Sequence, residues 1–478
     1  MHPYTDADFD FLKDADMIPT IHHADKPLYE QIYEFYKDAI LKKHLNYRER
    51  LPSYRVLAKE LGIGNNTVLK AYEQLVLEGY VTNEHRRGLF VTRIDHKDWH
   101  IEAGNPAMRV KEKQEKAWNP AFNTSIHLVD EHTFPMKQWR KCSNWALDSI
   151  SFQYPEYEKD DPLKEQLIQY LFQYRGVRAT PEQLLIGSGA TVLVFWLAFI
   201  LRNSCSRILT EDPGYPRTRQ LFQEFNYHVK PIRVATHGID LQQLAREKAD
   251  LLYLTPSHQY PTGAAIPVSH RIQILNWAKK NKAYIIEDDF DCEFRYKTKL
   301  MSSLQGLDRD NRVIYIGTFS NALMPSLRVA YMVLPGQFPI PYTSYSYLTN
   351  TAPYFTRKAL ALFIEKGYWE RHLKKMRILY KRKYEACIEA LQALPENRIH
   401  FNQTPSGLNI LLRIQSRLSE KEMLVRAQNN GVVVTPASVF YFDKSNQPKY
   451  PEVLFEFGSL PLDEIKKIVG KLYKAWFS

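Results

Sequence analysis

Apolar positions along the chain follow two different periods, which divide it into a helical head and a longer α/β part. From Pro27 onward, Leu28, Ile32 and Ile40 recur at helical spacing, which predicts an amphipathic first helix. From about Ala121 to the C-terminus, short β-branched runs alternate with helical patterns. That alternation is typical of an α/β domain with a largely parallel central sheet.

The stretch that follows the first helix predicts two more helices and a hairpin. Ser53 suits the N-cap of a helix over residues 54–61. After a glycine turn, a further helix begins at Asn65 or Asn66 and runs to about Glu78, which gives a helix-turn-helix pattern. The sequence GYVTNEHRRGLFVTRI then predicts strands over residues 80–82 and 89–92 around a tip at 84–88.

Residues 27–93 resemble the winged helix of GntR-type bacterial transcription regulators. The motifs LPSYRVLAKELGI, NNTVLKAYEQL, EGYV and RRGLFV carry this resemblance, in that order. It implies binding to double-stranded DNA, with the third helix in the major groove and the wing at the minor groove. The residues expected to contact DNA are Ser53, Arg55, Asn65, Asn66, Thr67, Lys70, Arg86 and Arg87.

Charge qualifies the DNA-binding hypothesis. Residues 27–93 contain 11 Lys and Arg against 8 Asp and Glu, so we expect tight binding to require a dimer. The whole chain has a net charge of +11, and its excess lies beyond residue 100. A winged helix that contacts protein is the alternative, and the four basic residues expected on the DNA-facing side disfavour it.

The flanking segments and the composition set further bounds. Residues 1–26 contain six aspartates, which predicts a loosely held acidic tail, and residues 94–120 carry a charged run typical of a linker. The longest apolar run, Val192–Leu201, is too short to span a bilayer and predicts a buried helix. The four cysteines lack metal or disulfide spacing, and the N-terminus lacks a signal-peptide pattern. We therefore expect a cytoplasmic protein without a metal site.

Polar residues follow the apolar runs of the second part. Asp288 comes after a predicted strand at 283–286, and Ser320 and Arg328 come after another at 313–316. Because the carboxyl ends of parallel strands meet at one edge of a sheet, we expect these side chains to lie close together. A carboxylate, hydroxyl groups and an arginine suit a heterocyclic cation that carries a phosphate, such as pyridoxal phosphate.

Two earlier motifs add to this candidate site. In GSGA, the amides of Gly189 and Ala190 are predicted at a helix N-terminus, which can bind a phosphate. In EDPGYPR, Tyr215 can stack on a flat ring and Arg217 can meet a carboxylate.

The ordered series GSGA, EDPGYP, TPSHQYPTG, EDDFD, GTFS-ALMPSLR and ERHLKKMR resembles the fold-type I, pyridoxal phosphate-dependent aminotransferase-like domain of the GabR-like MocR subfamily of GntR regulators. With the head, the resemblance covers residues 27–478. It implies an effector and dimerisation domain over 121–478, with a small C-terminal subdomain from about residue 393, and a head-to-tail homodimer. It also implies roles for Asp288 at the pyridinium nitrogen, Tyr215 in stacking, Ser320 and Arg328 at the phosphate, and Arg217 at an effector carboxylate.

The sequence departs from this family at the residue on which the chemistry depends. Asn321 stands where the family has its Schiff-base lysine, and an amide nitrogen is not nucleophilic. Phe290 replaces a tyrosine that meets the phenolic oxygen of the cofactor. Other polar positions of the family are occupied by Thr191, Val192, Leu454 and Phe455. We therefore expect no catalytic residue, and pyridoxal phosphate bound without a covalent bond if it binds at all.

Three interpretations of the pocket remain open at this stage. The cofactor binds non-covalently, or the pocket takes another ligand or none in a dimerising scaffold, or Lys297 or Lys299 replaces the missing lysine. The leading functional hypothesis is a DNA-binding transcriptional regulator. The alternatives are an active aminotransferase with an accessory DNA-binding head, which Asn321 opposes because transamination needs a lysine as base, and a protein-interaction scaffold.

Overall fold

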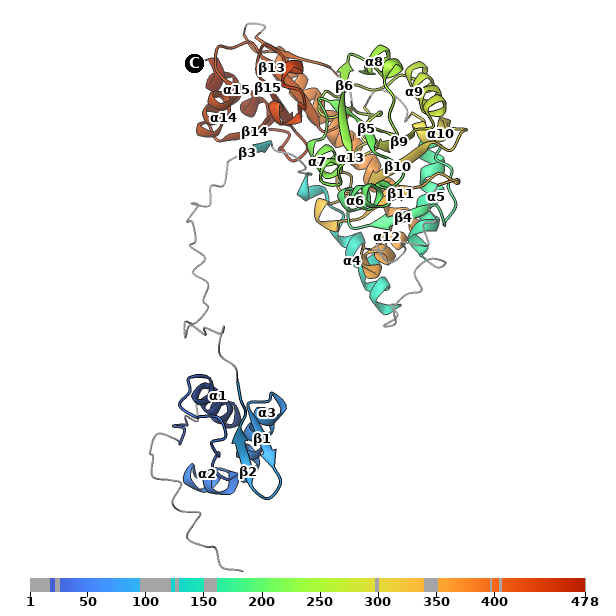
Figure 1. The fold of residues 1–478 in the computed structure, drawn as a ribbon. Coiled ribbons are helices and arrows are strands. Elements are labelled where there is room, and N and C mark those ends of the chain that lie inside the picture. The colour runs from blue at the N-terminus through green and yellow to red at the C-terminus, as the bar shows by residue number, and fades with distance from the viewer. Residues whose placement is uncertain are drawn as a thin grey trace, which may run out of the picture. The chain divides into compact units, whose positions relative to one another are not determined.

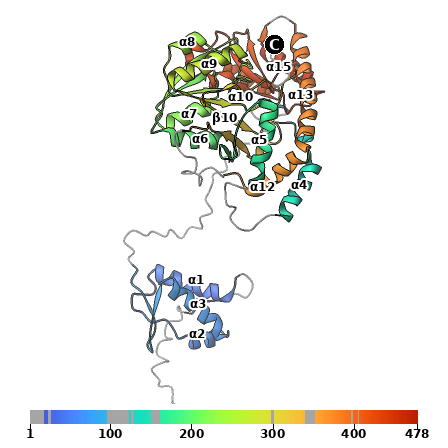
Figure 2. The same cartoon turned by 90° about the vertical axis from the view of Figure 1, so that its right-hand side faces the viewer.

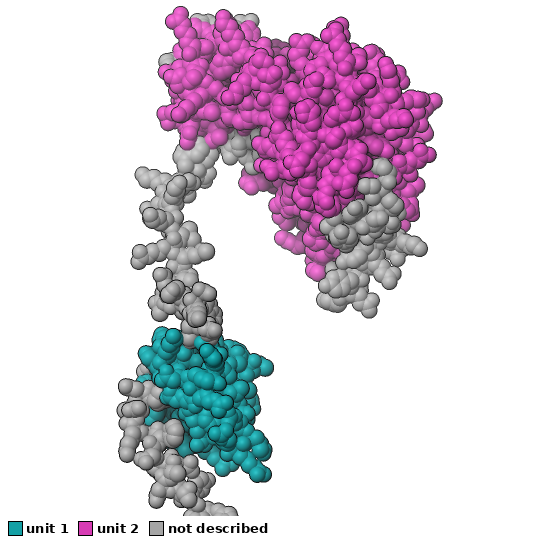
Figure 3. All heavy atoms as spheres, viewed as in Figure 1, with its two compact units in different colours: residues 1–115 teal, residues 116–478 magenta. Residues whose placement is uncertain are grey.

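The chain divides into two compact units, residues 1–115 and 116–478, which are described separately (Figure 3). The structure is a computed structural model, and it describes residues 18–21, 26–94, 122–124, 129–149, 161–296, 301–338, 351–395, 398–403 and 406–477. Most of the predicted tail, nearly all of the predicted linker, and Lys297 and Lys299 lie outside the described residues. Within the predicted tail, Ile18 and Ile21 pack against the core of the first unit.

The first unit is a three-helix winged helix (Figure 1). Its elements are α1 (Leu28–Leu41), α2 (Tyr54–Glu60), α3 (Asn65–Leu77), β1 (Val81–Glu84) and β2 (Gly88–Val91). The two strands pair antiparallel, and Glu84 lies opposite Gly88. The hairpin therefore extends further toward its tip than the sequence predicted, because the predicted tip residues 84 and 88 belong to the strands.

Local chemistry explains where these helices begin. The Ser53 hydroxyl oxygen accepts a hydrogen bond from the backbone amide of Val56 at 3.3 Å, which caps α2 as predicted. The core of the head contains Ile32, Tyr36 and Leu75, each with 0% exposure. These residues come from α1 and α3, so the packing of those two helices orients the outer face of α3.

The second unit is built on an eight-stranded sheet in the order β4-β11-β10-β9-β8-β5-β6-β7. The strands are β4 (Leu184–Gly187), β5 (Arg207–Asp212), β6 (His228–Ala235), β7 (Gly238–Ile239), β8 (Leu251–Leu254), β9 (Tyr284–Asp288), β10 (Val313–Thr318) and β11 (Ala330–Val333). The five strands from β10 to β6 are mutually parallel, while β7 and β11 run antiparallel to their neighbours. The predicted α/β fold with a largely parallel central sheet is confirmed.

Helices cover both faces of this sheet (Figure 2). They include α5 (Pro162–Arg175), α6 (Ala190–Leu201), α7 (Pro216–Glu224), α8 (Leu241–Arg246), α9 (Val268–Asn281) and α10 (Leu304–Leu307), whereas α4 (Met136–Asp148) packs beside α12 (Tyr354–Glu365). Successive side chains of β10 point to opposite faces of the sheet. Ile314 and Ile316 pack in the core cluster that contains residues of α6, whereas Tyr315 packs in the cluster that contains residues of α5. The apolar run Val192–Leu201 lies in α6, a largely buried helix as predicted.

A smaller five-stranded sheet, in the order β12-β13-β15-β14-β3, forms a second layer with its own core. Its elements are β3 (Phe122–Thr124), β12 (Ile399–Phe401), β13 (Asn409–Ile414), β14 (Val432–Pro436), β15 (Glu452–Glu456), α14 (Glu420–Asn429) and α15 (Ile465–Phe477). The strand β3 pairs parallel with β14. This subdomain therefore includes the start of the second unit as well as its C-terminal end.

The long helical segment before the small subdomain is two helices, α12 (Tyr354–Glu365) and α13 (Tyr368–Gln392). Gly367 separates them with a left-handed backbone at φ 66°, which a side chain would disfavour. The four cysteines are free and buried. Among the described residues, no helix is long and apolar enough to cross a membrane, and no cluster of potential ligands suits a metal ion.

The head core gives a first test of this fold. Leu75 is fully buried in α3, whereas Leu77 on the same helix is 81% exposed. Leu75→Ala should therefore lower the free energy of unfolding of the head by about 2–5 kcal/mol, and Leu77→Ala by less than about 0.5 kcal/mol. Hydrogen exchange of α1 and α3 peptides in the full-length protein measures both. Equal effects of the two variants would contradict this packing.

Candidate functional site

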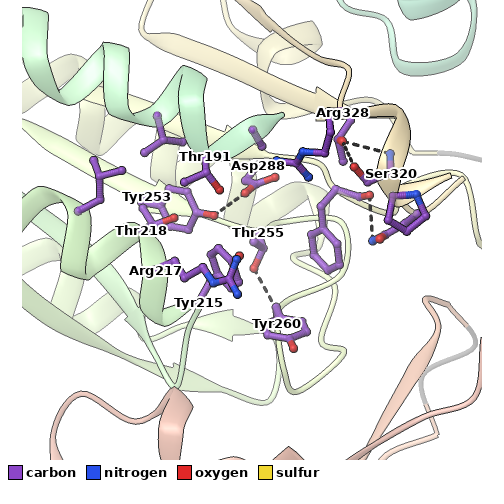
Figure 4. Close-up of a pocket in the computed structure, with 17 residues that line it drawn as sticks. Thr191, Tyr215, Arg217, Thr218, Tyr253, Thr255, Tyr260, Asp288, Ser320 and Arg328 are labelled. Atoms are coloured by element: carbon purple, nitrogen blue, oxygen red, sulfur yellow. Dashed lines mark hydrogen bonds between the residues drawn. The ribbon is translucent and has the colours of Figure 1, made fainter. Parts of the chain in front are cut away.

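A cavity of about 170 Å³ lies at the carboxyl ends of β8, β9 and β10, beside the N-terminus of α6 (Figure 4). Its lining is Ala190, Thr191, Val194, Tyr215, Arg217, Thr218, Leu221, Tyr253, Thr255, Tyr260, Asp288, Phe290, Thr318, Ser320, Asn321, Pro325 and Arg328. Segments more than a hundred residues apart in the sequence meet here. Of the residues that the sequence predicted for a cofactor or effector, all except Gly189 line this cavity, and Gly189 lies directly beside it.

Asp288 ends β9 and forms one pole of the cavity. The hydroxyl of Tyr253 donates a hydrogen bond of 2.5 Å to Asp288 Oδ2 (Figure 4). Its other oxygen, Oδ1, is shielded from solvent and has no hydrogen-bond partner among the described residues. Burial raises the pKa of Asp288 to about 7, and the negative charges of nearby Asp289 and Asp291 add to this shift against the opposing hydrogen bond of Tyr253.

Asp289 occupies a different environment although it is adjacent in the sequence. It forms an ion pair with Arg175, with 2.7 Å between Oδ2 and Nη2, and accepts a hydrogen bond of 2.7 Å from the hydroxyl of Tyr315. Burial acts to raise the pKa of Asp289, but Arg175 and the hydrogen bonds outweigh it and hold the pKa below its ordinary value. Asp289 is therefore paired with a cation inside the core, although its Oδ1 has no hydrogen-bond partner among the described residues, and Asp288 is the carboxylate that lines the cavity.

The opposite pole collects groups that can bind an anion. Gly189 precedes α6 with φ 105°, and a Cβ atom there would overlap the guanidinium of Arg328. Arg328 Nη2 donates to the Ser188 carbonyl oxygen at 3.3 Å. The hydroxyl groups of Thr318 and Ser320 lie 3.1 Å apart. A glycine, an arginine, two hydroxyls and the amides of a helix N-terminus together make a suitable cradle for a phosphate.

Asn321 follows these hydroxyl groups and is 9% exposed. Its Nδ2 donates a long hydrogen bond of 3.4 Å to the carbonyl oxygen of Phe290. No lysine is present among the described residues that line the cavity. The proposed substitutes Lys297 and Lys299 lie outside the described residues.

An aromatic wall closes the side of the cavity toward the small subdomain. The ring of Tyr260 meets Phe290 edge-on at 5.7 Å between centroids, and it meets Tyr215 at 6.1 Å and Phe440 at 5.1 Å. Leu454 belongs to the same apolar cluster. Arg217 is exposed at the mouth of the cavity. Phe455 belongs to the core of the small subdomain, and Val192 on α6 is not one of the residues that line the cavity.

The predicted DNA-binding residues lie in three places of the head: on α3, in the turn of the β1–β2 hairpin, and at the start of α2. Asn65, Asn66 and Lys70 are exposed on α3, and Thr67 is half-buried. Arg86 and Arg87 are exposed on the connection between β1 and β2. Ser53 and Arg55 lie at the start of α2, where Ser53 also serves as the cap.

Three of these basic side chains already make contacts within the head. Lys70 Nζ lies 3.7 Å from the centroid of the Tyr29 ring. Arg87 forms an exposed ion pair of 2.6 Å with Glu84, and the guanidinium of Arg55 lies over the ring of Tyr54 at 5.6 Å. Exposed contacts of this kind contribute about 0–1 kcal/mol, so all three cations can be redirected to another anion at small cost.

Each of the two units matches a known protein family. Residues 28–91 match the family model for bacterial regulatory proteins of the gntR family, and residues 121–449 match that for aminotransferases of class I and II. The chain is 35% identical over 474 residues to the "Uncharacterized HTH-type transcriptional regulator YdeL" of Bacillus subtilis (strain 168), covering 96% of this chain and 99% of that protein. It is 28% identical over 443 residues to the "Probable rhizopine catabolism regulatory protein MocR" of Rhizobium meliloti, covering 89% of each.

This chain belongs to the MocR-type GntR regulators. The fold of its second unit is also that of a crystallised kynurenine aminotransferase from Pyrococcus horikoshii, solved in complex with PMP. The TM-score is 0.68 at 23% identity, over 75% of this chain and 91% of that one. At this identity the likeness concerns the fold alone.

The cavity of this MocR-type chain fits pyridoxal phosphate at both ends. The unpartnered Asp288 Oδ1 can accept a hydrogen bond from a pyridinium N–H, and the cradle around Gly189 and Arg328 can take a phosphate. When bound, this cofactor supplies an electron-withdrawing ring. The residues that line the cavity would hold and orient it there.

Sequence analysis of this MocR-type chain missed Tyr253, Thr218, Thr255 and Tyr260. Tyr253 lies in the apolar run LLYL, which looks like an ordinary buried strand. The available signal was the tyrosine itself, because a buried phenol needs a hydrogen-bond partner. Tyr260 also lines the cavity, and its buried hydroxyl has no partner among the described residues.

The raised pKa of Asp288 makes a testable prediction about stability. A carboxyl whose pKa rises from 3.8 to about 7 on folding destabilises the folded state when it ionises, so stability is lost between these two pH values. Asp288→Asn keeps the shape and can still accept from Tyr253. At pH 8 it should stabilise the ligand-free protein by about 1–2 kcal/mol, and near pH 4 the gain should vanish.

Thermal unfolding of the second unit at both pH values measures this difference. Asp310→Asn is the matched control, because Asp310 makes an exposed ion pair with Lys279 and should change stability by less than about 1 kcal/mol. A lower melting temperature for Asp288→Asn than for the unchanged protein at pH 8 would contradict this prediction, because it would mean that the ionised carboxylate stabilises the folded state.

Proposed function

We propose that this chain is a DNA-binding transcriptional regulator whose aminotransferase-like domain senses a small effector and holds a dimer together. The observation that carries the proposal is that one chain contains both a winged helix and an aminotransferase-like cavity. The winged helix exposes polar and basic residues on α3, and the described residues that line the cavity include no lysine. Such a chain acts on chromosomal DNA in the cytoplasm.

In the head, α3 would enter the major groove of double-stranded DNA. Asn65 and Asn66 carry amides that can pair with adenine edges; Thr67 follows them directly, and Lys70 lies about one turn further along α3. Ser53 and Arg55 would meet phosphates, which fix the register without reading sequence. Arg86 and Arg87 on the wing would reach the minor groove, where negative potential favours guanidinium groups.

In the second unit, pyridoxal phosphate or a close derivative would bind without a covalent bond. Asp288 would accept from the ring nitrogen, Tyr215 would stack on the ring, and Ser320 and Arg328 would hold the phosphate together with the amides at Gly189 and Ala190. Arg217 at the cavity mouth would meet an effector carboxylate. Because Asn321 has no nucleophilic nitrogen, these contacts alone would retain the ligand.

The competing hypothesis is an active aminotransferase with an accessory head. Transamination requires a base that moves the substrate proton, and a lysine usually performs this step. Asn321 cannot do so at neutral pH. Among the other residues that line the cavity, the carboxylate of Asp288 would be occupied by the ring nitrogen, so regulation is the function that the site favours.

A homodimer, arranged head to tail as in the resembling family, completes the proposal. The head has a positive excess of only three charges over residues 27–93, and one head alone would bind DNA weakly at physiological salt. Two heads held by dimerised second units would bind two half-sites and multiply this affinity.

DNA binding is tested with Arg55→Ala combined with Arg87→Ala. Affinity of the full-length protein for its own promoter region should fall by about 10-fold or more at physiological salt. The slope of log K against log salt should become less steep by about 0.9 for each phosphate that the variant no longer neutralises. Fluorescence anisotropy over a salt series measures both quantities.

The control for this experiment is Lys42→Ala combined with Lys43→Ala. These residues follow α1, about 20 Å along the helix axis from Tyr29, on which Lys70 rests. The control removes the same charge and should retain most of the affinity. If both double variants bind DNA like the unchanged protein, the proposed docking is wrong.

Covalent capture is tested with Asn321→Lys. Incubation with pyridoxal phosphate, borohydride reduction and peptide mass spectrometry should find no cofactor attached at residue 321 of the unchanged protein. The variant should carry it on the introduced lysine, and Asn321→Gln, which is similar in size but not nucleophilic, should not. Stoichiometric attachment to another lysine in the unchanged protein would contradict non-covalent binding.

A further inference from the structure

A single long hydrogen bond of 3.4 Å orients the carboxamide of Asn321. Its Nδ2 donates to the carbonyl oxygen of Phe290, and the residue is 9% exposed. Rotating the amide by 180° would place Oδ1 against that carbonyl oxygen, so that two acceptors would face each other. One of the two N–H groups of Nδ2 is used in this bond, and Oδ1 is the acceptor that Asn321 has available for a ligand, since no donor among the described residues bonds to it.

We propose that the pocket selects the amine form of the cofactor, pyridoxamine phosphate, over the aldehyde form, because Asn321 presents a hydrogen-bond acceptor where the family has a lysine. This inference rests on the proposed binding of a pyridoxal phosphate-type ligand and names the form that is bound. A protonated amine donates to an amide oxygen, whereas an aldehyde oxygen can only accept.

Phe290 supports the same choice independently. A phenylalanine cannot donate to the phenolic oxygen of the ligand, and its ring is fixed between His258 at 6.1 Å and Tyr260 at 5.7 Å. The hydroxyl of Tyr253 is already used by Asp288, and Figure 4 shows the Tyr260 hydroxyl directed away from Asp288. The amine form carries its own donor beside its phenolic oxygen, and the aldehyde form does not.

The two poles of the cavity do not distinguish the two forms. Both forms have the same ring nitrogen for Asp288 and the same phosphate for the cradle of Gly189 and Arg328. Discrimination therefore depends on the contacts at Asn321 and Phe290. A ligand that cannot donate to Asn321 Oδ1 leaves this nearly buried acceptor unpaired. Such a loss weakens binding by about 10- to 100-fold.

This selectivity suits a sensor. A ligand that is not covalently attached exchanges with solution, so occupancy follows the concentration of the free amine form. That form arises when an amino group is transferred to pyridoxal phosphate or when pyridoxamine is phosphorylated. The protein would then report on amino-group transfer without performing it.

The experiment is calorimetric titration of the full-length protein with pyridoxamine phosphate, followed by competition with pyridoxal phosphate. Competition is used because surface lysines capture aldehydes. The unchanged protein should bind the amine form at least about 10-fold more tightly than the aldehyde form. Borohydride reduction of parallel samples checks that the aldehyde arm reports reversible binding.

Three variants locate the selectivity. Asn321→Leu removes the acceptor and should bring the ratio of the two affinities close to one. Asn321→Asp keeps the acceptor, loses the N–H that donates to the Phe290 carbonyl, adds a negative charge that attracts the protonated amine, and should increase the ratio. Phe290→Tyr restores a donor for the phenolic oxygen and should strengthen the aldehyde form selectively. Melting temperatures and promoter affinity of the variants confirm that they are folded.

Equal affinities for the two forms, or tighter binding of the aldehyde, would overturn this inference while leaving the proposed pocket intact. Failure of both forms to bind would overturn the inference and the proposed cofactor pocket together. Neither result would affect the DNA-binding half of the proposed function, because that half is measured separately on the promoter region.

Discussion

The buried carboxylates around the end of β9 impose the constraint on which the site depends. A buried negative charge is costly unless a cation or several donors compensate it. Asp289 is paired with Arg175, and Asp291 lies 2.6 Å from His258 Nδ1. Asp288 has only the phenol of Tyr253 and one oxygen without a partner among the described residues. Asp289 thus has an arginine beside it and Asp291 a histidine, whereas Asp288 lines the cavity, where a ligand can supply its partner.

Much of this site could be predicted from sequence because strand ends converge in a parallel sheet. Asp288, Ser320 and Arg328 were expected to meet, and the structure brings them to one cavity. Tyr253 was missed because an aromatic residue in an apolar run usually packs in the core, and Tyr260 because it lies in the loop TPSHQYPTG, whose path the sequence pattern does not give. Which side of a strand faces a cavity depends on register and on the neighbouring helices, and a local pattern contains neither.

The parts of the fold that depend on neighbouring residues in the sequence could be predicted, and those that depend on contacts between distant residues could not. Helical periodicity identified α1, a continuous apolar run identified α6, and the glycine turn that marks the start of α3 was visible in the sequence. The pairing of β3 with β14 joins residues about three hundred positions apart, so no sequence window contains it. Gly367 was present in the long helical segment, but a lone glycine is tolerated within helices, and its left-handed backbone is fixed by packing.

Three of the departures from the aminotransferase pattern, at Asn321, Phe290 and Leu454, are connected through contacts in one wall of the cavity. Asn321 bonds to the backbone of Phe290, whose ring packs against Tyr260, and Tyr260 packs with Leu454 in the same apolar cluster. A lysine introduced at residue 321 would regain a nucleophile, but it would lose the bond to the Phe290 carbonyl and would still face an apolar wall. Restoring one residue would therefore leave the rest of this wall unchanged, so the residues at 290, 321 and 454 act on the pocket together.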